Sequence, residues 1–150
     1  MTVRFNLGGD RSCAECRRWV YADGSALTIE QAISKDIPPQ VYAYLDELSS
    51  SNDRKKQIRF AGILVRFEAF SIYGELEPPR ELNYLRGNLQ EIKTQQDRVL
   101  FYEVPATANH RRAVRLTNAC EKRVSKTSRG KLPRKHLELG EAIERIDRDV

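Results

Sequence analysis

Basic side chains concentrate in one part of the sequence, where they could bind phosphate groups. Residues 111–135 hold ten lysines and arginines and one acid, Glu121, so this segment carries +9. The whole chain carries +5, which leaves −4 for the remainder. This asymmetry predicts a face that binds polyanions. The alternative is that these basic residues lie in a solvent-exposed loop and bind nothing. An uninterrupted basic run exceeds what solubility needs and favours phosphate binding. The run comprises Lys122, Arg123, Lys126, Arg129, Lys131, Arg134 and Lys135.

Two cysteines near the start of the chain, Cys13 and Cys16, have the C-x-x-C spacing of zinc and redox sites. A structural zinc site needs four ligands, usually from two such pairs. The chain has no second pair, so Cys120 and a histidine could complete a site only by distant convergence. A redox C-x-x-C normally starts a helix in a βαβ unit, which is not indicated here. The residues therefore predict no metal site.

Few side chains could exchange a proton with a substrate. His110 lies in an expected loop and His136 in the first turn of an expected helix, and both fit ordinary surface positions. Tyr102 fits a core position, although a tyrosine or a lysine can act where no histidine does. The sequence therefore leaves the general base and the general acid unassigned.

The bulk composition is that of a globular domain. The chain has 150 residues, 40% hydrophobic and 31% charged, which predicts one domain over residues 17–150 after a lead-in over residues 1–16. No apolar run approaches the roughly 20 residues that a membrane span needs. The first residues lack the apolar core of a secretion signal, so we expect a cytoplasmic protein with reduced cysteines and no membrane partner.

The first half of the chain predicts one strand followed by helices. Residues 17–23 contain Trp, Val and Tyr and predict a strand. The sequence TIEQ from Thr28 fits a capping box and predicts a short helix over residues 28–34. Prolines 38 and 39 start a further helix, and Asp53 can cap a longer one to about residue 70, with residues 58, 61, 64 and 65 available to the core. Apolar and polar residues also alternate over residues 65–73 as in a strand, so the sequence allows either a helix or a strand there.

The second half predicts three strands and a closing helix. The strands are expected over residues 89–93, 98–104 and 112–120, with a basic loop over residues 122–132 and a helix from Pro133. Strands joined by short connections are normally antiparallel. The order strand, helices, three strands, helix predicts an α+β fold, a small antiparallel sheet with the N-terminal helices packed on one face and a C-terminal helix.

The order of these segments resembles the phage-derived HigB-like branch of the RelE toxin superfamily. The likeness rests on residues 85–93 (LRGNLQEIK), residues 98–102 (RVLFY), the Lys122-Arg123 pair after the next strand, and Pro133 before the last helix. Residues 23–33 and the helix after Ile37 also resemble the first half of that family. Three departures are Lys93 where the family has arginine, Cys120 where it has an aromatic residue, and a longer basic loop at residues 125–132.

The resemblance implies a RelE-like fold and a toxin that cleaves mRNA, often on the ribosome, without a metal or organic cofactor. It also implies neutralisation by a helix-turn-helix antitoxin. By position in the family, Arg98 would stabilise the transition state, and Lys122 and Arg123 would hold the scissile phosphate. Alternatively, Arg98 forms an ordinary ion pair on the surface and has no role in catalysis. The expected RNA-binding residues are Lys93, Arg86, Lys126, Arg129 and Lys131.

Two other functions fit the same residues. One is a non-catalytic module that binds RNA or the ribosome through the basic run. The other is a regulatory protein that keeps the fold and has lost activity, which the changes at Lys93 and Cys120 favour because fold alone does not establish function. Growth arrest that depends on Arg98 would favour the nuclease, and salt-dependent binding without cleavage would favour the binding module.

Overall fold

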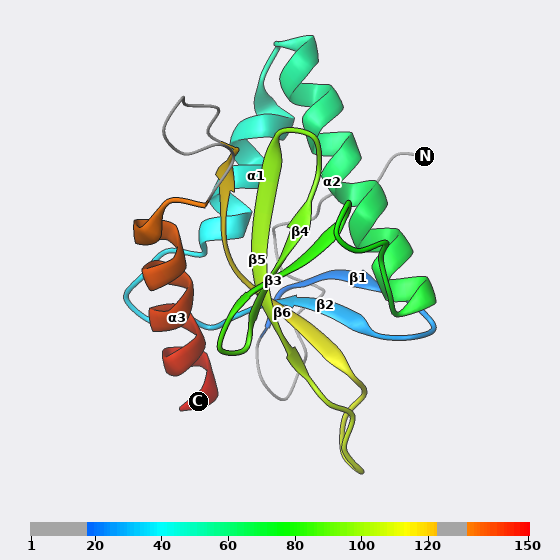
Figure 1. Cartoon of the computed structure of the whole chain (residues 1–150), viewed down its shortest axis with the longest axis vertical. Coiled ribbons are helices and arrows are strands. Elements are labelled where there is room, and N and C mark those ends of the chain that lie inside the picture. The colour runs from blue at the N-terminus through cyan, green and yellow to red at the C-terminus, as the bar shows by residue number, and fades with distance from the viewer. Residues whose placement is uncertain (1–17, 123–131) are drawn as a thin grey trace.

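The computed structural model describes residues 18–122 and 132–150. These residues form six strands and three helices (Figure 1). The expected lead-in, Cys13, Cys16 and most of the basic loop lie outside the described residues. The elements in chain order are β1 (Val20–Asp23), β2 (Thr28–Gln31), α1 (Gln40–Ser50), α2 (Arg54–Tyr73), β3 (Leu82–Arg86), β4 (Leu89–Lys93), β5 (Asp97–Val104), β6 (Ala113–Glu121) and α3 (Arg134–Arg148).

All six strands belong to one mixed sheet in the order β1-β2-β6-β5-β4-β3. Every neighbouring pair is antiparallel except β2 and β6, which run parallel. The α+β fold class is thus confirmed, and the expectation of a wholly antiparallel sheet is wrong at this pair. The parallel pair is possible because α1, α2 and three strands intervene between β2 and β6, and parallel neighbours need such a crossover.

The segment that begins at Thr28 is a strand, so the prediction of a helix over residues 28–34 is wrong. Its backbone is hydrogen-bonded on both sides, because Gln31 N donates to Trp19 O at 2.8 Å and Thr28 N donates to Arg112 O at 3.1 Å. Buried Ile29 and Gln31 alternate with half-buried neighbours, which is the period of a strand. Gln31, the presumed capping residue, instead accepts a hydrogen bond from the Tyr21 hydroxyl at 2.6 Å through its Oε1.

The helix α2 ends later than the sequence indicated. Asp53 caps its start by accepting a hydrogen bond from Lys55 N at 2.9 Å, as predicted. Gly74 closes the other end with φ 75°, a conformation that glycine adopts without strain, and its N–H donates to Phe70 O. Residues 65–73 are therefore helical, which excludes the strand reading. The extra edge strand β3 was not predicted, because the sequence showed only the turn at Gly87.

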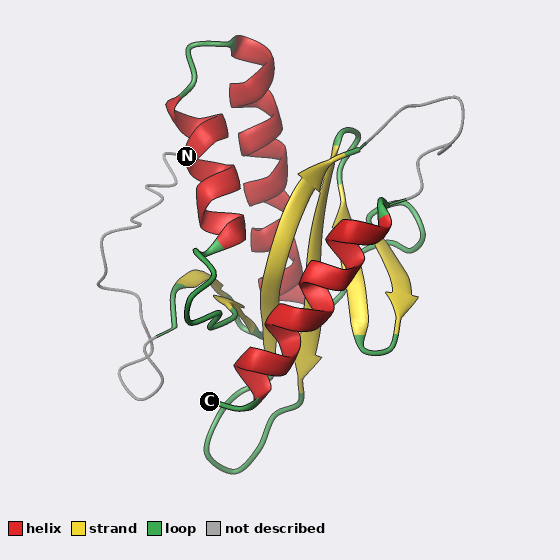
Figure 2. Ribbon diagram, turned by 90° about the vertical axis from the view of Figure 1, so that its left-hand side faces the viewer, coloured by secondary structure: helices red, strands yellow, loops and turns green. Residues whose placement is uncertain are grey.

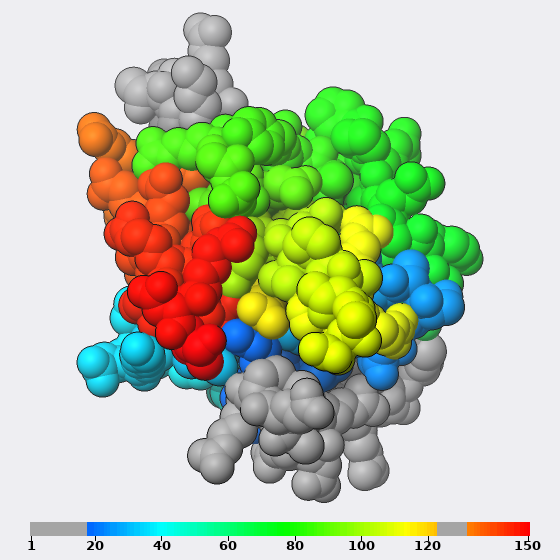
Figure 3. All heavy atoms as spheres, turned by 90° about the horizontal axis from the view of Figure 1, so that it is seen from below, coloured from blue at the N-terminus to red at the C-terminus, as the bar shows by residue number. Residues whose placement is uncertain are grey.

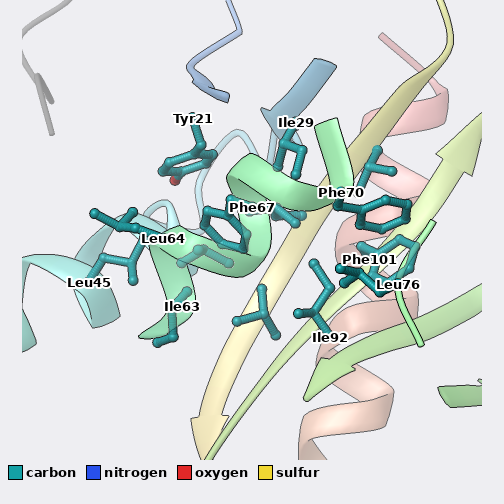
Figure 4. Packing of buried hydrophobic residues seen from close by; sticks show 14 of the residues in the cluster. Tyr21, Ile29, Leu45, Ile63, Leu64, Phe67, Phe70, Leu76, Ile92 and Phe101 are labelled. Carbon is teal, nitrogen blue, oxygen red and sulfur yellow. The ribbon is translucent and has the colours of Figure 1, made fainter. Parts of the chain in front are cut away.

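The main core lies between the sheet and the pair α1–α2. Large side chains from α2, such as Phe67 and Phe70, meet Ile92 and Phe101 of the sheet (Figure 4). Leu64 joins this core as expected, whereas Ile58 and Val65 are 62% and 60% exposed. Ala61 is exposed as well, so the predicted core role of all three residues is wrong. The buried stripe of α2 instead follows Ile63, Leu64, Phe67 and Phe70.

The C-terminal helix covers the opposite face of the sheet, so the helices are not all gathered on one face (Figure 2). Leu100 and Tyr102 point to this side of β5, whereas Val99 and Phe101 point to the core of α1 and α2. Gly140 lets α3 approach closely, because a Cβ there would lie 3.0 Å from Asn118 Oδ1 and 3.1 Å from Leu100. The sheet is thus sandwiched between α1–α2 and α3.

Candidate nucleic-acid interface

Two of the basic residues singled out in the sequence meet on the α3 face of the sheet. Lys93 on β4 lies directly opposite Arg98 on β5, and Arg98 lies opposite Cys120 on β6. Opposed residues of antiparallel strands point to the same face, so these three side chains form a row across the sheet. The buried Cys120 closes this row where the resemblance led us to expect an aromatic residue.

Arg98 is largely committed to holding the neighbouring turn. Its Nη1 donates to Thr94 O at 2.7 Å and to Asp97 O at 2.9 Å, and its side chain is only 8% exposed. These bonds join β5 to the turn over residues 94–96. In this position the buried guanidinium fixes the end of the sheet. Its remaining N–H groups are left to bind a ligand at the row.

Glu91, on β4, is a candidate base that the sequence analysis did not single out. Its Oε1 lies 4.0 Å from Arg98 Nε and accepts a hydrogen bond from Asn83. Its Oε2 is buried and accepts no hydrogen bond from the described part of the chain. Nearly all buried polar atoms are paired, so an unpaired carboxylate oxygen beside an arginine is a place where a proton or a donor could bind. The E-x-K spacing on β4 was its only sequence signal.

The same turn is braced from the other side of the sheet by Asp97. Its buried carboxylate accepts hydrogen bonds from Arg59 Nη2 at 2.7 Å, from Thr94 Oγ1 at 3.2 Å and from the Tyr44 hydroxyl. The hydrogen bonds to Asp97 raise the pKa of Arg59, and burial together with Asp97 raises the pKa of Tyr44. Both groups therefore keep their protons at neutral pH, and the turn is fixed from two faces.

Lys122 follows β6 at the same end of the sheet, as the basic pair was expected to do. Its backbone N–H donates to Gln96 O at 2.6 Å, which places it beside the turn. A hollow of about 510 Å³ opens there between Gln95, Gln96, Glu121 and Lys122. The predicted residues Arg123, Lys126, Arg129 and Lys131 belong to this end by sequence but lie outside the described residues.

The structure divides the basic segment that the sequence presented as one. Arg111 pairs with Asp23 at 2.8 Å and Arg112 with Glu103 at 2.6 Å, both at the opposite end of the sheet from Lys122. Figure 3 looks onto that end, where the loop between β5 and β6 faces the viewer. His110 lies in the same loop, so it cannot act on a phosphate held at Lys122. The expectation of a single basic face over residues 111–135 is therefore wrong for Arg111 and Arg112.

Arg86 also lies away from the row. It ends β3 opposite Leu89, whereas Lys93 is at the other end of β4. Its guanidinium donates to Glu141 of α3, and this hydrogen bond raises the pKa of Arg86 and lowers that of Glu141. His136, in the first turn of α3, contributes its backbone carbonyl to a hydrogen bond from Asn118. The structure thus brings Lys93, Arg98 and Lys122 to one end of the sheet and leaves Arg86 elsewhere.

Among residues 18–122 and 132–150, no group of three or more histidine, cysteine or acidic side chains could hold a metal ion. No helix in these two stretches is long and apolar enough to cross a membrane. The sequence matches no protein-family model, and no curated protein is significantly similar to it.

Proposed function

We propose that this protein is a metal-independent endoribonuclease that cleaves mRNA, and that it acts as the toxin of a type II toxin–antitoxin system. The observation that supports this is the row Lys93–Arg98 on the sheet, with Lys122 beside the same braced turn and the unpaired Glu91 oxygen next to Arg98. Cations on a rigid frame beside a carboxylate are what metal-free phosphodiester cleavage requires.

In the proposed reaction the ribose 2′-oxygen attacks the adjacent phosphorus, and the bond from phosphorus to the 5′-oxygen breaks. Glu91 Oε2 takes the 2′-proton, and a protonated group returns one to the leaving 5′-oxygen. Arg98 and Lys122 stabilise the charge that develops on the phosphorane, and Lys93 holds a neighbouring phosphate. Arg123 would join Lys122, and Lys126, Arg129 and Lys131 would bind flanking phosphates. The products are a 2′,3′-cyclic phosphate and a 5′-hydroxyl end.

A non-catalytic RNA-binding or ribosome-binding protein is the second candidate, and one observation favours it. Arg98 is nearly buried, and its Nη1 donates hydrogen bonds to two backbone carbonyls. An arginine with a purely structural role would make the same contacts. In that case the row would bind phosphates without stabilising a transition state.

Purified protein and a single-stranded RNA separate the two candidates. We expect cleavage in EDTA that yields cyclic-phosphate ends, and we expect Lys122→Ala and Glu91→Gln to reduce it by roughly a hundredfold. Arg145→Ala, which removes one exposed positive charge on α3, serves as the matched control and should cleave normally. RNA that is bound but remains intact would establish the binding protein instead.

Salt dependence adds a measurement that does not require cleavage. The logarithm of the affinity falls linearly with the logarithm of the salt concentration, and each lost phosphate contact to a single strand makes this slope shallower by about 0.7. Lys93→Ala and Lys122→Ala should each show this change, and Arg145→Ala should not. Equal slopes for all variants would place the RNA on another surface.

The toxin assignment also requires a partner and a cellular effect. We expect expression to arrest growth with fragmented mRNA, and a helix-turn-helix antitoxin to restore growth. An Arg98→Ala, Lys122→Ala double variant should be harmless while remaining folded by circular dichroism. If wild-type expression leaves growth and message intact, the toxin assignment is wrong.

A further inference from the structure

The helix α2 carries a row of aliphatic side chains on the face that points away from the core. Ile58, Val65 and Ile72 are 62%, 60% and 39% exposed and are separated by seven residues each. The small residues Gly62 and Ala69 lie between them on the same face. We call these five residues the α2 seam. Apolar residues with a heptad spacing form the seam of helix pairs, and this one extends over about 21 Å.

The three large side chains of the α2 seam, Ile58, Val65 and Ile72, lie outside the core cluster, whereas Ala69 packs against its edge. The buried stripe of α2, with Ile63 and Phe67, points to the opposite side of the helix. Single exposed aliphatic residues are ordinary, but a continuous row of them marks an interaction surface. Gly62 adds room for a close approach, because a Cβ there would meet only Arg66 Nη1 at 3.8 Å. Figure 1 shows α2 along one edge of the molecule, where a partner can reach it.

Positive charge borders the seam on the flank beside the turn over residues 94–96. Lys55, Arg59 and Arg66 follow one another there. A hollow of about 410 Å³ between α2 and this turn is lined by these three residues together with Ile58 and Gly62 of the seam. Seam and hollow therefore form one continuous surface, apolar along its centre and basic along one edge.

Of the three border cations, Lys55 is the one left for a partner. Lys55 is exposed and forms no ion pair with any residue that the structure describes. Arg66 is paired with Glu81, whose Oε2 lies 3.6 Å from Arg66 Nε. Arg59 is likewise committed to Asp97. A partner that supplies carboxylates along this edge would pair with Lys55.

We propose that the α2 seam docks an amphipathic helix of a partner protein that is acidic along one edge. The apolar face of that helix would cover Ile58, Val65 and Ile72, and its acids would face Lys55. A second copy of this chain fits less well, because antiparallel pairing of two α2 helices would set their basic borders against each other. RNA would use the cations but would leave the aliphatic row exposed. The proposal is independent of the nuclease activity.

Two synthetic helical peptides of 20 residues, equal to the length of α2, provide the test. Both carry leucines at heptad positions, and one has glutamates and the other lysines along the edge beside them. We expect the full chain to bind the glutamate peptide at least tenfold more tightly in fluorescence anisotropy. Val65→Asp should weaken this binding at least tenfold, and Ala43→Asp on the exposed side of α1 should not change it. Lys55→Glu should shift preference toward the lysine peptide.

Four results would overturn the proposal. Binding of neither peptide, or equal binding of both, would exclude a helix with an acidic edge as the partner. Binding of the glutamate peptide that survives Val65→Asp would place it elsewhere. A wild-type dimer that Val65→Asp converts to a monomer, seen by light scattering, would make a second copy the occupant. Competition by a single-stranded RNA that depends on Lys55 would assign the surface to RNA. Thermal unfolding of each variant identifies loss of fold, and Val65→Lys repeats the disruption with the opposite charge.

Discussion

The two faces of the sheet hold their helices by different means. On one face, apolar side chains such as Val99, Phe101 and Leu116 pack against α1 and α2 without polar contacts among them. On the other face, α3 is held largely by Asp147, whose buried carboxylate pairs with Arg18, Tyr102 and Arg115 and accepts a hydrogen bond from Ile33 N at 2.8 Å. The first face is mainly an apolar core, with the bonds from Arg59 and Tyr44 to Asp97 at one end, and the second relies on the discrete bonds to Asp147.

This difference indicates where specificity and function can lie. Apolar contacts are non-directional and tolerate rearrangement, whereas a buried carboxylate fixes its donors in one geometry. The row with Lys93 and Arg98 lies on the polar face, beyond the start of α3. A face built of directional bonds can hold charged side chains in place for a ligand. The following variants test the contrast, from the largest expected effect to the smallest.

Phe101→Ala should cause the largest loss of stability, because the side chain is fully buried between the sheet and α2. We expect the free energy of unfolding to fall by about 3–5 kcal/mol, from lost burial and the cavity left behind. Chemical denaturation measures it. Val65→Ala removes an exposed aliphatic side chain from α2 and should change stability by less than about 0.5 kcal/mol. Equal effects of the two variants would contradict the described core.

Asp147→Ala should act locally on the polar face. Removing one partner of a buried ion pair typically costs about 3 kcal/mol or more, and Arg115 retains a second partner in Glu30. We expect amide exchange to accelerate first in α3, while α2 stays protected. The exposed Asp149, changed to alanine, is the matched control. Uniform loss of protection in all helices would show that the two faces are not held independently.

The two faces each contain a tyrosine hydroxyl that donates to a buried aspartate, which gives a matched pair. Tyr102 donates to Asp147, and Tyr44 donates to Asp97. Tyr102→Phe should cost about 2 kcal/mol, because a hydrogen bond to a charge is lost at a fully buried site. Tyr44→Phe should cost about 1 kcal/mol, because Arg59 and Thr94 still donate to Asp97. A larger loss for Tyr44 would reverse the comparison.

High pH tests the same network. Burial raises the pKa of Tyr44 and of Tyr21 above the usual 10.0, so their neutral forms stabilise the fold below that pH. This stability is lost as the pH rises, because the unfolded tyrosines ionise first. We expect a falling unfolding midpoint above about pH 10, with a shallower fall in Tyr44→Phe and Tyr21→Phe. A slope unchanged in both variants would contradict the described burial.

The smallest effect is expected for the exposed pair of Arg86 and Glu141. The hydrogen bond from Arg86 lowers the pKa of Glu141 below the usual 4.5, so the pair stabilises α3 at neutral pH and is lost as the pH falls through that lowered value. Arg86→Ala should leave the unfolding midpoint nearly unchanged at pH 7, as is usual for exposed pairs. If it nevertheless weakens RNA binding as much as Lys122→Ala, then Arg86 belongs to the interface after all.

Much of the element order followed from local sequence signals. The capping Asp53, prolines 38 and 39 and the pattern around Leu45 predicted α1 and α2, and β4 was predicted with its observed bounds. These signals succeed because caps, prolines and apolar periods act within one element. The failures at Thr28 and at residues 82–86 concern short strands, whose stability comes from neighbours that the local sequence does not name.

For the candidate interface, the sequence by itself determined that phosphate-binding cations are concentrated after β6, because charge needs no fold to be counted. Only the tertiary structure decided which cations act together. Strand register set Lys93 beside Arg98, and the direction of β5 and β6 sent Arg111 and Arg112 to the far end, where acids neutralise them. The unpaired oxygen of Glu91 and the exposed α2 seam likewise follow from packing, which decides for each side chain whether it meets protein or is left for a ligand.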